Sequence, residues 1–106
     1  MKNLIVIFLL LAGVVSAQVE VIHFNAGWNS SNDVKWVDEL NDCEIKYIDI
    51  ANDANAATEW EIVVVPTIIV FNGKEVKRFP ADISFAMKAT KSEVQEVVDE
   101  ILMDQF

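Results

Sequence analysis

The dipeptide Asn72-Gly73 separates two short runs of strand-forming residues, "TIIVF" before it and "EVKRF" after it. Asn-Gly between two such runs is the strongest short-range signal for a β-hairpin, because a type I′ turn needs two residues that tolerate positive φ. Pro66 lies just before the first run, where its missing N–H does least harm to strand pairing. The sequence therefore predicts an antiparallel hairpin in the second half of the chain.

Two earlier segments also have the pattern of strands. The run "QVEVIHF" at residues 18–24 alternates between polar and apolar residues and is rich in β-branched side chains. The run "CEIKYIDI" at residues 43–50 is apolar on both faces, which favours a strand in the centre of a sheet.

Three helices are expected around these strands. Ser30 or Ser31 can cap the first helix, whose apolar residues recur at three-residue steps up to Leu40. A short second helix is expected from about Ala54 to Trp60, where alanines favour helix formation. The third helix begins with the capping box "TKSE" and continues with an apolar stripe at helical spacing. The element order predicts an α/β layer in which two parallel strands, joined by a right-handed crossover, are extended by the antiparallel hairpin.

The first 17 residues have the composition of a secretory signal peptide. Lys2 precedes the apolar run "LIVIFLLLAGVV", and the small residues Ser16 and Ala17 come just before Gln18. The apolar run is shorter than the roughly 20 residues that span a bilayer. We therefore expect residues 1–17 to be removed and residues 18–106 to form the single domain of an exported protein. A retained membrane anchor and a buried element of the fold are the alternatives.

Charge and cysteine content restrict the function. The formal net charge is −9, and nucleic-acid binding depends on Lys and Arg side chains that neutralise phosphates, so nucleic acid is not an expected partner. Cys43 is the only cysteine, which excludes an internal disulfide and a two-cysteine redox centre within the chain. One His and one Cys exclude a tetrahedral zinc site, and the acidic segments lack EF-hand spacing. No metal or cofactor is therefore expected, and Cys43 is interpreted as a semi-buried free thiol.

Two segments of the chain resemble the thioredoxin family. The segment "VIHFNAGWNSSND" is similar to the family's strand and active-site loop, with Trp28 where a Trp precedes the redox pair. The segment "WEIVVVPTIIVFNGKEVKRF" resembles the region of the family's cis-proline and following hairpin, with Val65, Pro66 and Thr67 at the motif. The resemblance covers residues 19–102 and implies a minimal, glutaredoxin-sized thioredoxin-like fold. Such a fold has a mixed four-stranded sheet flanked by about three helices, in the order β-α-β-α-β-β-α.

The redox motif of that family is missing from this chain. Where the family has Cys-x-x-Cys, this sequence has Asn29, Ser30, Ser31 and Asn32. Disulfide exchange needs a thiolate that attacks sulfur, so oxidoreductase activity is not expected. A serine nucleophile would need a base within hydrogen-bond reach, but His23 lies on the preceding strand and is interpreted as a satisfied core or rim histidine.

The resemblance also implies a ligand groove between the active-site loop and the cis-proline loop. In the family, the backbone of the cis-proline loop pairs with an extended peptide or with glutathione. The candidate contact residues by resemblance are Trp28, Asn29, Ser30, Val65, Pro66 and Thr67. We expect Trp28 to be partly exposed, and Trp36 and Trp60 to pack against the sheet.

These observations favour an exported, redox-inactive thioredoxin-like domain that binds an extended peptide or a protein partner. One alternative is a thiol-dependent oxidoreductase or a glutathione-binding enzyme of the same superfamily, in which Asn29 or Ser30 would hydrogen-bond the thiol of glutathione. Another is a structural, self-associating protein. Its basis is the apolar alternation from Ile83 to Met87, which would leave apolar side chains facing outward. A second copy of the chain could cover them and form a homo-oligomer.

Overall fold

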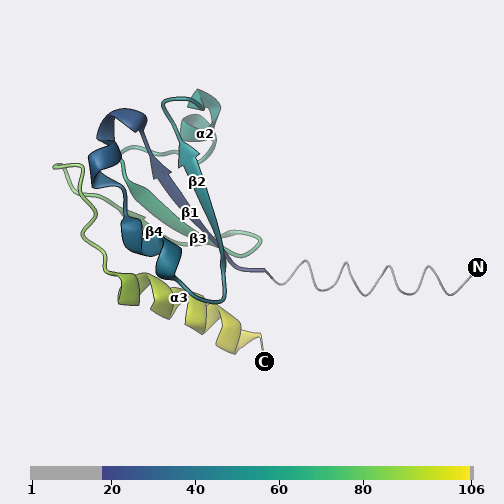
Figure 1. Ribbon diagram of the computed structural model, residues 1–106. Coiled ribbons are helices and arrows are strands. Elements are labelled where there is room, and N and C mark those ends of the chain that lie inside the picture. Colours follow the sequence, from purple (N-terminus) through teal and green to yellow (C-terminus); the bar gives the residue numbers. More distant parts are fainter. Residues whose placement is uncertain (1–17, 106) are drawn as a thin grey trace, which may run out of the picture.

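The computed structural model describes residues 18–105 (Figure 1). The expected signal peptide at residues 1–17 lies outside the described residues. No helix within residues 18–105 has the length and apolar character needed to cross a membrane. The elements are, in order, β1 (Glu20–Asn25), the 3₁₀ helices η1 (Gly27–Asn32) and η2 (Lys35–Glu39), β2 (Glu44–Asp49), α2 (Ala54–Glu59), β3 (Thr67–Phe71), β4 (Glu75–Pro80) and α3 (Lys91–Asp104).

The strands form one mixed sheet in the order β2-β1-β3-β4. β1 pairs in parallel with β2 and antiparallel with β3, and β3 pairs antiparallel with β4. The four-stranded mixed sheet predicted from the sequence is therefore confirmed. The prediction that residues 43–50 form a central strand is wrong, because β2 lies at an edge of the sheet. Its two apolar faces have another cause: Ile45 packs on one core cluster and Ile48 on the other.

Each face of the sheet buries its own apolar cluster, since side chains alternate along a strand. On one face, residues of β1 and β3 pack against η2 and α3; the buried members include Val21, Val37, Ile68, Val94 and Val98. On the other face, Ile22, Phe24 and Ile69 pack with partly buried residues that follow α2. Trp36 packs on the first cluster and Trp60 on the second, as predicted.

Both α-helices begin next to a residue whose side chain caps them. In α3, Thr90 Oγ1 accepts a hydrogen bond from the Glu93 N–H at 3.2 Å, and Glu93 Oε1 accepts one from the Thr90 N–H at 2.8 Å. This is the predicted capping box. In α2, the Asp53 carboxylate accepts a hydrogen bond from the Ala56 N–H.

The first predicted helix is replaced by the short 3₁₀ helices η1 and η2. Neither Ser30 nor Ser31 is a cap, because both lie inside η1, and its N-cap position is held by Ala26 without a side-chain hydrogen bond. The three-residue spacing of the apolar side chains fits the three residues per turn of a 3₁₀ helix. In addition, the Val34 N–H donates to His23 Nε2 at 3.1 Å, so it is withdrawn from any continuous helical ladder.

The predicted hairpin forms between β3 and β4, but its connection has three residues rather than two. Phe71 pairs with Glu75, and the pairing is irregular between Val70 and Phe71. Gly73 has φ of 77°, whereas no positive φ occurs at Asn72. A type I′ turn needs positive φ at both central residues, so the connection is not of that type.

Candidate functional site

Three loops meet at one end of the sheet. Thr67 at the start of β3 pairs with Phe24 near the end of β1 and with Pro80 at the end of β4. The segments that follow β1, precede β3 and follow β4 are therefore neighbours in space, and Figure 1 shows η1 and the loop after β4 at this end. We call this region, residues 26–33, 62–66 and 81–87, the loop end.

The buried side chain of Asn29 connects the three loops by hydrogen bonds. It stands at the first cysteine position of the redox motif by resemblance, and its exposed fraction is only 6%. Its Nδ2 lies 3.1 Å from Asn25 Oδ1, 3.2 Å from the Phe85 carbonyl oxygen and 3.5 Å from the Val65 carbonyl oxygen. Its Oδ1 accepts a hydrogen bond from Asn32 Nδ2 at 2.9 Å. The side chain of Asn29 therefore cross-links η1 to the two other loops.

Asn25 extends this amide network to the end of β1. Its Nδ2 donates to the Asn29 carbonyl oxygen at 3.1 Å and to Asp33 Oδ1 at 2.6 Å. The middle of η1 and its C-cap, Asp33, are thus bound to the same strand terminus. Amide groups neither titrate near neutral pH nor act as strong nucleophiles, so the network positions the loop and offers no group for disulfide exchange.

His23 is a satisfied core histidine, as predicted. It is buried, and its Nε2 accepts the hydrogen bond from the Val34 N–H. Burial lowers its pKa, an effect that the charges of Asp33 and Asp38 partly oppose. The neutral imidazole that accepts this bond has no free nitrogen lone pair for a serine, because its other nitrogen carries the proton.

Five of the six predicted contact residues lie in the loop end and the sixth, Thr67, borders it at the start of β3, but most of their side chains are buried. Trp28 is 68% exposed, as expected, and Ser30 is also exposed. The side chains of Asn29, Val65, Pro66 and Thr67 are buried. The peptide bond between Val65 and Pro66 is cis, and Thr67 Oγ1 donates to the Val64 carbonyl oxygen at 2.6 Å.

The exposed apolar surface at the loop end includes residues that sequence reasoning did not assign to the site. Phe85 packs edge-on against Trp28, with ring centroids 5.5 Å apart at 87°. Ile83 and Val63 are 96% and 94% exposed. The apolar alternation from Ile83 to Met87 indicated an outward-facing surface. It did not indicate the contact between Phe85 and Trp28, because that contact depends on how the loop after β4 folds.

A cavity of about 170 Å³ lies between η1, the 3₁₀ helix that carries Trp28, and the carboxyl ends of β1 and β2. Its lining combines apolar groups with two carboxylates; it includes Ala26, Gly27, Asp33, Tyr47, Ile48 and Asp49. The Asp49 carboxylate is held in place, since its Oδ1 accepts hydrogen bonds from the Gly27 N–H at 3.1 Å and from the Ala51 N–H at 2.9 Å. Tyr47 donates its hydroxyl hydrogen to Asp38, and burial raises the pKa of Tyr47 to about 12.

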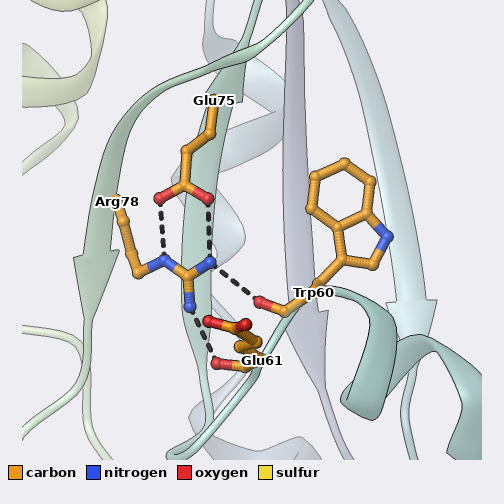
Figure 2. A network of polar contacts seen from close by, with 4 residues as sticks. All are labelled: Trp60, Glu61, Glu75 and Arg78. Atoms are coloured by element: carbon orange, nitrogen blue, oxygen red, sulfur yellow. Dashed lines mark hydrogen bonds and ion pairs between the residues drawn. The ribbon is translucent and has the colours of Figure 1, made fainter.

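Arg78 fixes the segment that leads into the loop before β3 (Figure 2). From β4, its Nε and Nη2 donate to the two carboxylate oxygens of Glu75 at 2.9 and 2.8 Å. Nη2 and Nη1 also donate to the carbonyl oxygens of Trp60 and Glu61 at 2.8 and 2.9 Å. Glu61 has φ of 53°. The guanidinium therefore holds a left-handed turn two residues before Val63.

Cys43 lies outside the loop end. It precedes Glu44, which pairs with Glu20 at the start of β1, so it is at the opposite end of the sheet. Burial raises the pKa of its thiol, and the charges of Asp42 and Asp99 act in the same direction. A thiol with a raised pKa is a poor nucleophile at neutral pH. Within residues 18–105, no three His, Cys, Asp or Glu side chains gather as a metal site would require.

Comparison with known proteins identifies the fold. No protein-family model matches the chain, and no match is found among curated proteins. Among solved structures, a wild-type thioredoxin h from poplar is 19% identical, with a TM-score of 0.62 over 86% of this chain and 82% of the other. A mutant thioredoxin from Halobacterium salinarum NRC-1 is 18% identical, with a TM-score of 0.62 over 80% and 75%.

A third similar structure is a thioredoxin from Fasciola hepatica, 21% identical, with a TM-score of 0.57 over 79% of this chain and 81% of the other. At such identities the likeness establishes the fold. The chain has a thioredoxin-like α/β fold and, with Cys43 as its single cysteine, it lacks the Cys-x-x-Cys motif.

Proposed function

We propose that this thioredoxin-fold protein is an exported, redox-inactive module that binds an extended peptide or a protein partner with its loop end. The observation that carries the proposal is the exposed aromatic pair of Trp28 and Phe85, with Ile83 exposed on the loop of Phe85 and Val63 exposed on the loop before β3. Large apolar side chains exposed at one end of a domain are costly to leave in water and are typical of interaction sites. Tryptophan in particular contributes large contact area at binding hot spots.

The rigidity of the site supports binding rather than catalysis. Asn29 bonds η1 to both other loops, and Arg78 fixes the approach to the loop before β3. A surface that is ordered before binding loses less conformational entropy when a partner docks. The glutathione alternative is less well supported, because the Asn29 amide that would contact a thiol is buried and already bonded to protein oxygens.

Redox inactivity is proposed from the chemistry of the residues. Asn29 and Asn32 cannot form a thiolate, and the only thiol, Cys43, is at the far end of the sheet. Export is proposed from the pattern of residues 1–17, which resembles a signal peptide cleaved before Gln18.

A capture experiment with matched variants tests the binding surface. The wild-type protein, Trp28→Ala and Met103→Ala are immobilised and incubated with the exported fraction of the producing cells. Met103 is a suitable control because it is also large, apolar and exposed, but it lies on α3. We expect the wild type and Met103→Ala to retain the same partner and Trp28→Ala to lose most of it. Equal retention by all three variants, or by none, would reject the loop end as the binding surface.

A further inference from the structure

The two carboxylates that line the cavity under η1 have no cation partners within the described chain. They are Asp33 and Asp49, and the cavity's lining also includes Gly27, which precedes Trp28 in η1. The ion pairs among residues 18–105 join other groups, namely Lys46 to Glu20, Arg78 to Glu75, Lys88 to Asp82 and Lys91 to Glu39. The hydrogen bonds to Asp49 come from backbone N–H groups and the Asn52 amide, which fix its position without neutralising its charge.

The lining of the cavity suits a long side chain with a cationic head. Ala26, Ile48 and the ring of Tyr47 provide apolar surface along which an aliphatic stem can lie. The partly exposed Tyr47 ring also offers an aromatic face, which attracts Lys and Arg cations. The carboxylates of Asp33 and Asp49 can accept charge-assisted hydrogen bonds from an ammonium or a guanidinium. An acidic or neutral side chain would gain none of these charge interactions.

We infer that the partner segment carries a Lys or Arg next to an apolar or aromatic residue. The apolar residue packs on Trp28 and Phe85, and the basic side chain enters the cavity between η1 and the end of β2. This inference rests on the proposed function and adds the chemical class of the partner. The net charge of −9 acts in the same direction, because it attracts basic segments and repels acidic ones over a longer range.

Selection from a library of short randomised peptides tests this inference on the purified protein. Three targets are compared: the wild type, a double variant Asp33→Asn/Asp49→Asn, and a control Glu96→Gln/Glu100→Gln with the same change in net charge on exposed positions of α3. The asparagines keep the oxygen acceptors that Asn25 and Gly27 use, so the fold is expected to persist. Circular dichroism and thermal unfolding verify this for each variant.

We expect peptides selected on the wild type and on the α3 control to be rich in Lys or Arg beside an aromatic or apolar residue. On Asp33→Asn/Asp49→Asn, the basic preference should disappear while the apolar preference stays. A selected peptide should lose about three- to fivefold in affinity when its basic residue is replaced by Gln, the range for a partly exposed ion pair.

Each other result overturns the inference in a recognisable way. Apolar peptides without a basic preference would leave the proposed function standing and remove only the cation pocket. Basic preference that weakens equally in the α3 control would mean a general charge effect. Failure to select any peptide, or concentration-dependent self-association through the loop end, would reject both the inference and the binding of an extended partner.

Discussion

At the scale of single residues, the loop end is held together by the amide of Asn29, which by resemblance stands at the first cysteine position of the family's redox motif. Asn29 is buried and reaches oxygens on β1, on the loop before β3 and on the loop after β4. The sequence alone predicts that this position cannot perform disulfide exchange. It does not predict the cross-linking role, because the Phe85 carbonyl is 56 residues away in the chain and reaches Asn29 only through the tertiary fold.

Replacing Asn29 should therefore cost stability rather than activity. Asn29→Ala removes hydrogen bonds to buried oxygens, and we expect a loss of about 1–3 kcal/mol in the free energy of unfolding, measured by urea denaturation. Ser31→Ala is the matched control, since Ser31 is exposed and next but one in the same 3₁₀ helix. Its effect should stay within about 0.5 kcal/mol. Equal effects of the two substitutions would contradict the role assigned to Asn29.

His23 makes stability depend on pH. Burial lowers its folded-state pKa below the ordinary value of 6.5, so below that value the unfolded chain binds more protons than the folded one. The stabilisation that the buried, neutral imidazole of His23 provides is therefore complete above about pH 6.5, and it is lost as the pH falls toward the folded-state pKa.

Urea midpoints of the wild type and of His23→Gln, measured from about pH 8 to about pH 5, test this sign. The amide oxygen of glutamine can accept the Val34 N–H but does not titrate in this range. We expect the wild-type midpoint to fall across the interval more steeply than that of the variant. Parallel profiles would show that His23 does not contribute to the pH dependence.

At the scale of elements, the sequence predicts those helices and turns whose formation depends on neighbouring residues in the chain. α3 forms where the capping box and apolar stripe place it, and the hairpin forms around Asn72-Gly73. The first helix is different, because it is interrupted at Val34, between η1 and η2, where the N–H of Val34 donates to His23 on β1 instead of to a helical carbonyl. The edge position of β2 is also not a local property. Both faces of the sheet are covered by other elements, so even an edge strand has apolar side chains on both faces.

The geometry of η1 leads to a prediction about the missing motif. The side chains of Asn29 and Asn32 hydrogen-bond to each other at 2.9 Å, so they face one another across one turn. In the double variant Asn29→Cys/Asn32→Cys, we expect the two new thiols to form an internal disulfide on mild oxidation. The control Asn29→Cys/Ser31→Cys places the second thiol on an exposed neighbour and should form it less completely.

Mass spectrometry after alkylation measures the disulfide, and an insulin-reduction assay measures activity. The wild type should be inactive, and the Asn29→Cys/Asn32→Cys variant should gain at least some turnover. Turnover by the wild type that disappears in Cys43→Ser would contradict the redox-inactive account. Failure of the double variant to close the disulfide would show that η1 does not keep the geometry of a redox loop.

At the scale of the whole molecule, the fold brings together loops that are far apart in the chain and leaves their apolar side chains in solvent. The sequence predicts the sheet from the strand patterns, the α3 cap from the capping box and the exposure of Trp28 from its place in a loop. It does not predict the Trp28–Phe85 pair, which depends on the register Phe24–Thr67–Pro80 and on the loop after β4. Nor does it predict the cavity, which forms where η1 lies over the paired ends of β1 and β2.

The central claim is that a partner docks on the loop end. Backbone amide chemical shifts of the protein, recorded with and without the captured partner, test it most directly. We expect the perturbed amides to concentrate in residues 26–33, 47–49, 62–65, 67 and 81–87, with α3 and the start of β2 unchanged. Perturbations concentrated on α3 or at the start of β2, with the signals of Trp28 and Phe85 unmoved, would contradict the account.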